Sequence, residues 1–170
     1  MKTFKISKKD LTLDNKSGVS CFEGNLEIDG DLGTVFFDHN LIVTGYILAK
    51  AGSGIKAGLG IEAGDGIKAG SGIEAGSGIK AGWGIEAGSG IKAGLRIEAK
   101  TLSAGSSYNI YAGISAWYKS SDIDNSIRIE KLISGNIICG KLIVTEIKKE
   151  NCCSGKIVEI DGKKYKLVEA

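Results

Sequence analysis

The sequence predicts an all-β protein: a three-sided, single-stranded parallel β-helix with about 18 residues per coil, followed by a C-terminal β-hairpin. Three observations predict this fold. A hexapeptide unit, Ile-charge-Ala-Gly-x-Gly, recurs through residues 51–100. The charged position of that unit alternates between Lys and Glu without a break. At the C-terminus, KIVEIDGKKYKLVEA places the turn signal Asp161-Gly162 between two alternating runs, which is typical of a hairpin.

The composition excludes several other classes of protein. The chain has 170 residues, with 26 glycines, no proline and a formal net charge of +2. This length suits one domain, and glycines at strict spacing indicate a tightly turned repeat rather than a linker. The absence of proline excludes collagen-like and polyproline structure. Because the charge is nearly balanced, direct binding of nucleic acid is not expected.

Within the hexapeptide, the Ile and the Ala two residues later share one side of an extended segment, and the charge lies on the other side. Ile and Ala are therefore predicted to form the core. The Gly-x-Gly is predicted to form a corner, which needs either a positive φ or close backbone packing that a Cβ would obstruct. The variable corner residue must face solvent, since both Asp65 and Trp83 occupy it. An α-helix is disfavoured, because each glycine inside one costs about 0.5–1 kcal/mol relative to alanine.

The charged positions form a ladder: Lys56, Glu62, Lys68, Glu74, Lys80, Glu86, Lys92 and Glu98. With about 18 residues per coil, every vertical neighbour in this ladder has the opposite charge, at the strand spacing of about 4.8 Å. Coils of about 12 or 24 residues would stack like charges, which destabilises directly apposed strands. The alternation therefore selects three sides. Because parallel crossovers are usually right-handed, we expect a right-handed coil.

The flanking sequence extends this pattern into a single domain of residues 1–170. Val35, Leu41 and Ile47 begin apolar-x-apolar units at the period of the hexapeptide, so the helix is predicted to start before the perfect repeat. The predicted parts are an N-terminal cap (1–20), irregular coils (21–50), the perfect repeat (51–100), further irregular coils (101–150) and the hairpin (151–170). The hairpin can serve as a cap over an open end of the solenoid or as an oligomerisation arm.

No residue pattern indicates a catalytic chemistry, a metal site or a cofactor. The candidates for metal ligands are the single histidine, His39, and the cysteines Cys21, Cys139, Cys152 and Cys153. They show no paired CxxC spacing and are interpreted as a solvated histidine and free thiols. No helical pattern follows the Gly-x-Gly pairs, so they do not predict a nucleotide loop. The N-terminus lacks the apolar run of a signal peptide and no stretch is long enough to span a bilayer, so we expect a cytoplasmic protein without membrane contact.

The hypothesis for a binding surface rests on the aromatic residues that interrupt or follow the regular repeat. The perfect faces neutralise their own charge, whereas aromatic residues dominate interfaces where they are exposed. The candidate binding residues are Trp83, Tyr108, Tyr111, Trp117 and Tyr118. The cluster of Tyr108, Tyr111, Trp117 and Tyr118 has an alternative interpretation, because such clusters are more often a cap or a packing patch than a ligand site.

Three resemblances suggest functions. The six-residue period and its aliphatic position resemble the triangular hexapeptide acyltransferases, a family with a catalytic histidine, which makes His39 a candidate. FEGNLEIDGDL is similar to the strand units of bactofilins, which polymerise end to end. The GIKAG/GIEAG repeat resembles small solenoid proteins of phages and mobile elements, some of which are anti-CRISPR-like inhibitors of host defence.

These resemblances leave three functions open. The first is a non-enzymatic protein that binds and blocks a protein or protein complex, as an inhibitor of host defence would. The second is a self-assembling scaffold that forms homo-oligomers through the solenoid ends or the hairpin. The third is an acyltransferase.

Overall fold

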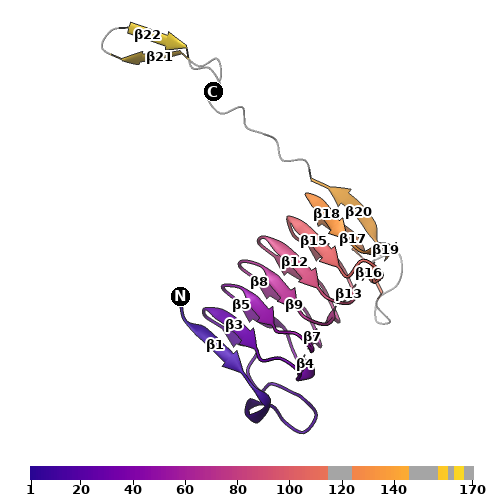
Figure 1. The fold of residues 1–170 in the computed structure, drawn as a ribbon. Coiled ribbons are helices and arrows are strands. Elements are labelled where there is room, and N and C mark those ends of the chain that lie inside the picture. Colours follow the sequence, from indigo (N-terminus) through magenta and orange to yellow (C-terminus); the bar gives the residue numbers. More distant parts are fainter. Residues whose placement is uncertain (115–123, 146–156, 161–162, 167–170) are drawn as a thin grey trace.

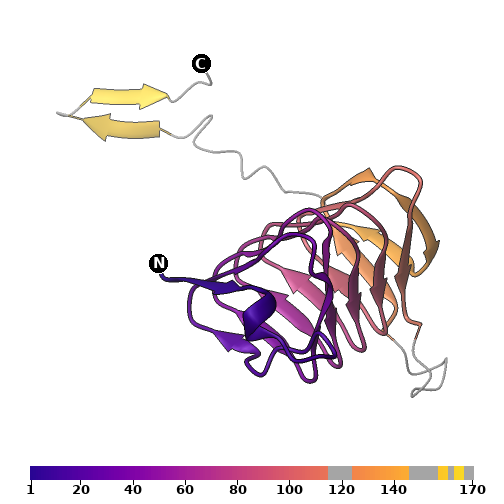
Figure 2. The ribbon, with the colours of Figure 1, turned by 60° about the horizontal axis from the view of Figure 1, so that its bottom comes forward.

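The chain folds as a parallel β-solenoid in which three sheets enclose one core (Figure 1). The computed structural model describes residues 1–114 and 124–145, together with the backbone of residues 157–160 and 163–166. Successive strands belong to different sheets, and the chain returns to the same sheet at every third strand of the repeat. Figure 2 shows the coils stacked along a common axis. The predicted three-sided β-helix is confirmed, and its hand stays a prediction.

Each sheet runs the length of the solenoid. The first sheet contains, in order, β1 (Thr3–Ile6), β3 (Asn25–Ile28), β6 (Ile47–Ala49), β9 (Ile67–Ala69), β12 (Gly84–Ala87), β15 (Thr101–Ala104) and β18 (Lys131–Ser134). The second contains β4 (Gly33–Phe37), β7 (Ser53–Ala57), β10 (Ile73–Ala75), β13 (Ile91–Ala93), β16 (Asn109–Ala112) and β19 (Asn136–Cys139). The third contains β2 (Cys21–Phe22), β5 (Leu41–Val43), β8 (Ile61–Ala63), β11 (Ile79–Ala81), β14 (Ile97–Glu98), β17 (Ser126–Ile129) and β20 (Lys141–Val144).

The strand register confirms the predicted period within the perfect repeat. Ile73 pairs with both Ile55 and Ile91, so each partner lies three hexapeptide units away. Before the repeat the coil is longer. Leu41 pairs with Ile61, whereas a coil of three hexapeptides would pair it with Leu59. The final coil is shorter, since Ile127 pairs with Leu142 instead of Thr145. The coil that directly follows the repeat is longer still, since Ile97 pairs with Ile127. The regular period thus belongs to the perfect repeat, and the coils on either side depart from it in both directions.

The core consists of the inward Ile and Ala side chains, as the alternation predicts. All of the repeat isoleucines from Ile55 to Ile97 are at most 2% exposed. Larger side chains, such as Leu26 and Phe37, occupy the same inward positions in the earlier coils. Burying an isoleucine contributes about 1.5–3 kcal/mol, so this stack of side chains is the main source of stability.

The corner glycines divide into two classes. Glycines that follow the Ala, such as Gly76, lie so close to the carbonyl of the coil before that a Cβ would collide with it. Most glycines that precede the Ile have more room, with Gly54 and Gly84 as exceptions, and a Cβ on Gly66 would approach no atom closer than 3.4 Å. Among residues 51–100 only Gly52 has a positive φ. Of the two predicted reasons for these glycines, close backbone packing is therefore the general one.

One corner residue contradicts the prediction that the variable position faces solvent. Ser53 is 0% exposed, and its hydroxyl donates a hydrogen bond to the carbonyl of Asp29 (2.6 Å) while it accepts one from the amide of Leu32 (3.0 Å). The reason is the longer connection between β6 and β7, where Gly52 turns the chain and leaves the serine inside. The corner residues Asp65 and Trp83 are exposed, as expected.

The N-terminal segment predicted as a cap also supplies the first strand of a sheet. β1 pairs in parallel with β3, and the short 3-10 helix η1 (Lys8–Asp10) follows it. Phe4 packs edge-on against Phe22 with 5.4 Å between the ring centroids. Ile6 and Phe22 are 5% and 6% exposed, so this end of the core is closed.

The predicted C-terminal hairpin is present. β21 (Ile157–Ile160) and β22 (Lys163–Lys166) pair in antiparallel register, with Val158 opposite Tyr165. In the part of the chain that the structure describes, no helix has the length and apolar character needed to cross a membrane.

Candidate functional site

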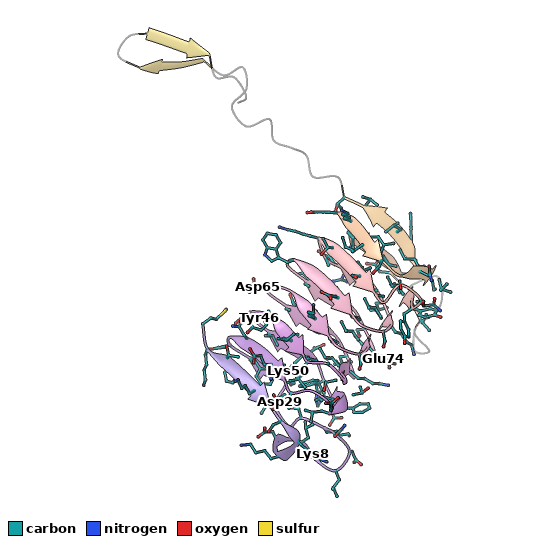
Figure 3. All side chains as sticks on the ribbon, viewed as in Figure 1. Lys8, Asp29, Tyr46, Lys50, Asp65 and Glu74 are labelled. Carbon is teal, nitrogen blue, oxygen red and sulfur yellow. The ribbon has the colours of Figure 1, made fainter. Side chains whose placement is uncertain are left out.

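Backbone hydrogen bonds stack the corner residues into columns, one along each edge of the solenoid. Along the edge between the third and first sheets, Asp65 N–H donates to Gly45 O (3.1 Å) and Trp83 N–H donates to Asp65 O (3.1 Å). The next residue in this column is Lys100, whose amide donates to Trp83 O (2.6 Å). We call Gly45, Asp65, Trp83 and Lys100 the Trp83 corner. Figure 3 shows Asp65 on this edge, near Tyr46, which follows Gly45.

Trp83 is the most exposed aromatic side chain among residues 1–114 and 124–145, at 62%. The Lys100 ammonium lies 3.9 Å from the centroid of the indole ring, which is a cation–π contact. Because the backbone of Trp83 is hydrogen-bonded to the coils on both sides, its Cα position is rigid. The corner thus presents a large apolar side chain on a preorganised support.

A shallow groove of about 570 Å³ runs over the outer face of the first sheet beside the Trp83 corner. Gly66 and Gly84, which lack side chains, form part of its lining, and the ion-paired Lys68 and Glu86 form another part. Each of these glycines directly follows an exposed corner residue, Asp65 or Trp83. The corner therefore borders a recess that a partner side chain can enter.

A hydrogen bond holds Tyr46, which lines this groove together with residues of β6. The Tyr46 hydroxyl donates a hydrogen bond to Glu27 Oε1 (2.9 Å). This hydrogen bond raises the pKa of Tyr46 above its usual value, with smaller contributions in the same direction from partial burial and from the Glu27 charge. Tyr46 therefore remains a neutral hydrogen-bonding group at physiological pH.

The structure does not bring the predicted aromatic residues into one cluster. Tyr108 is 50% exposed and follows β15, so it lies across the first sheet from Trp83, which precedes β12. Tyr111 is half-buried on the outer face of the second sheet, beside Lys92, and accepts a hydrogen bond from Asn109 Nδ2 (3.0 Å). Trp117 and Tyr118 lie outside the described residues. Trp83 and Tyr108 are thus separate features of the surface.

Sequence reasoning missed Lys100 as part of the candidate site. It is the first residue after the last Ala of the repeat, and the sequence pattern marks it only as the point where the repeat ends. In the structure this break brings the ammonium over the indole ring. The sequence separation could have identified this contact, since Lys100 follows Trp83 by roughly one coil of about 18 residues.

The charged ladder forms most of the predicted ion pairs, but Glu98 pairs with Arg96 (3.9 Å) and not with its vertical neighbour Lys80. Glu74 lies between two lysines, with Oε2 3.2 Å from Lys56 Nζ and Oε1 3.3 Å from Lys92 Nζ. Lys68 pairs with Glu86 (2.9 Å), and Lys80 pairs with Glu62 (3.3 Å). Partial burial by itself raises the pKa of Glu74, but the hydrogen bonds and charges of the two lysines outweigh it, and the net pKa is lowered. The outer faces therefore neutralise much of their own charge.

Reversing the central charge of this ladder should destabilise the solenoid. Glu74→Lys places three lysines in one column, and we expect it to lower the free energy of unfolding by about 1 kcal/mol at low salt. The loss should shrink at high salt, because exposed pairs are screened. Glu74→Gln, which removes the charge without reversing it, should have a smaller effect. Thermal melting of both variants at two salt concentrations tests this, and equal effects would show that the ladder charges do not interact.

The remaining candidates do not assemble into a site. His39 is exposed, and its carbonyl accepts a hydrogen bond from Leu59 N–H (3.4 Å), which makes it a corner residue on another edge. Cys21 is exposed and Cys139 is half-buried, both as free thiols, while Cys152 and Cys153 lie outside the described residues. No group of three or more metal-ligating side chains occurs within the described ranges.

Comparisons with models of known protein families, with curated proteins and with solved structures find no match for this chain. The fold and the geometry of the Trp83 corner are therefore the basis for assigning a function.

Proposed function

We propose that the chain is a non-enzymatic interaction protein, which binds a macromolecular partner through the Trp83 corner and the adjacent groove. The observation that carries this proposal is a 62% exposed tryptophan on a rigid backbone beside a recess of about 570 Å³. Exposed tryptophans on preorganised scaffolds are the residues that most often dominate protein interfaces.

The contrast with the rest of the repeat supports this choice of surface. The outward positions on the two sheets that meet at the corner carry Lys and Glu in ion pairs, which leaves little free charge for recognition. Lys100 can act together with the indole ring, because its ammonium is held against the ring and can also approach a carboxylate of the partner. A protein surface with an apolar pocket beside an acidic group would fit this combination.

The test compares Trp83→Ala with a matched control, Leu59→Ala. Leu59 is 46% exposed and lies on a different edge of the solenoid. The immobilised wild-type chain first captures its partner from a host lysate, and the affinity of the purified partner is then measured for each variant. We expect Trp83→Ala to weaken binding by about thirtyfold or more, as for a hot-spot residue, and Leu59→Ala to leave it unchanged. An equal affinity for both variants would show that the corner is not the binding surface.

A specific form of this proposal is an anti-CRISPR-like inhibitor of host defence, which would capture a protein or ribonucleoprotein of the host machinery. The two other functions give different results in solution. A scaffold would form species whose mass grows with protein concentration in light scattering. An acyltransferase would show an acyl-CoA-dependent activity that His39→Ala abolishes.

A further inference from the structure

The two ends of the solenoid differ in how their cores are covered. At the N-terminal end Ile6 and Phe22 are buried, and Phe4 and Leu11 pack against the core. At the other end the last coil consists of β18, β19 and β20, and each of them is the final strand of its sheet. Their outer edges have no partner strand among the described residues.

The last coil also leaves apolar side chains in contact with water. Leu142 and Val144 of β20 are 44% and 56% exposed, whereas their partners on β17, Ile127 and Ile129, are 0% exposed. Lys141 and Thr145 donate their amides to the β17 side. Since amides alternate in direction along a strand, those of Leu142 and Val144 point to the open edge. This end therefore needs an occupant that brings both hydrogen-bonding groups and apolar surface.

The same requirement excludes a lipid bilayer as the occupant, because unpaired backbone groups are costly in hydrocarbon. A second solenoid end would have to pair with all three edges at once. Two of those edges are irregular: the register shifts between β15 and β18 and between β16 and β19, and such bulges disrupt edge pairing. The edge of β20 is regular over its full length.

The chain itself carries a suitable occupant. By their register, Val158 and Ile160 of β21 share a face with Lys163 and Tyr165, whereas Ile157 and Glu159 share the other face with Lys164 and Lys166. One face is thus mostly apolar and the other mostly charged, which is the same division as in the solenoid strands. An isolated two-stranded hairpin is only marginally stable in water, so β21 and β22 would gain stability from a third strand.

We propose that the hairpin formed by β21 and β22 pairs with the open edge of β20 in the same chain, continues the third sheet and covers the end of the core with its apolar face. The connection that leads from Val144 to Ile157 reaches at most about 45 Å when fully extended. Because the hairpin is tethered to the end that it would cover, its effective concentration there favours this intramolecular contact over a second copy at micromolar concentrations.

Hydrogen–deuterium exchange of the full chain tests this proposal with two matched Ile→Lys variants in β21. Ile160→Lys alters the apolar face, and Ile157→Lys alters the charged face. We expect the amides of Leu142 and Val144 to be protected in the wild type and in Ile157→Lys, and to exchange at least tenfold faster in Ile160→Lys. Fast exchange in all three proteins would overturn the proposal, as would protection that disappears on dilution, which would indicate a second copy.

A reciprocal pair of variants separates loss of docking from unfolding of the hairpin by Ile160→Lys. Val144→Lys changes the proposed contact, while Ile133→Lys changes a residue of β18 with nearly the same exposure, 55% against 56%. The amides that pair β21 with β22 should exchange faster in Val144→Lys and remain as in the wild type in Ile133→Lys. Equal exchange in these two variants would show that the hairpin does not rest on β20.

Discussion

Ile79→Ala is expected to lower the free energy of unfolding by about 2–5 kcal/mol, the usual cost of truncating a fully buried isoleucine. Ile79 is 0% exposed and stacks between Ile61 and Ile97 in the third sheet. Its removal leaves a cavity between two coils, and the neighbouring isoleucines cannot fill it because their own strands keep them in register. Denaturant unfolding followed by circular dichroism measures the loss.

The control is Ile42→Ala in the same sheet. Ile42 points outward and is 40% exposed, so its truncation removes little buried surface and opens no cavity. We expect a change below about 1 kcal/mol. If both variants lost the same stability, the inward isoleucines would not be the principal source of stability.

Gly76→Ala is expected to destabilise the protein by about 1–3 kcal/mol, as overpacking of a close contact does. A Cβ at this position would collide with the carbonyl oxygen of Gly58 in the preceding coil. Relief of the collision requires the two coils to separate, which weakens the hydrogen bond from Gly76 N–H to Ala57 O (3.1 Å). The thermal midpoint of the variant should fall accordingly.

Gly66→Ala is the matched control, because Gly66 is the second kind of corner glycine. A Cβ there meets its nearest atom, the Gly84 carbonyl oxygen, at 3.4 Å, and the backbone has no positive φ. The substitution should leave stability unchanged or raise it by about 0.4–1 kcal/mol, since alanine restricts the unfolded chain more than glycine does. Equal destabilisation by both variants would contradict the division into two classes.

The sequence was sufficient to predict the architecture because the determinants of the fold are local and repeated. The Ile-x-Ala alternation specifies which side chains are buried, and the Lys and Glu order of the ladder selects three sides through the sign of its vertical neighbours. The observed pairs of Glu74 with Lys56 and Lys92 follow that order. The C-terminal hairpin was predictable for the same reason, since Asp161-Gly162 is a local turn signal.

The candidate site was predictable only in part. Trp83 could be identified as an exposed corner because its position in the repeat is a solvent position. Its contact with Lys100 joins two residues on successive coils, and the length of the intervening coil decides whether they meet. The separation of Tyr108 from Trp83 depends likewise on which edge of the solenoid each residue reaches.

The sequence by itself determined the period, the number of sides and the division between core and surface. Only the tertiary structure decided which glycines are indispensable, why Ser53 is buried, and which end of the core is left open. The physical reason is that alternation and charge order act between positions separated by one regular repeat. Contacts at the corners and at the ends depend instead on the length of each individual coil. That length is greater before the perfect repeat than within it, greatest directly after it, and smallest in the final coil.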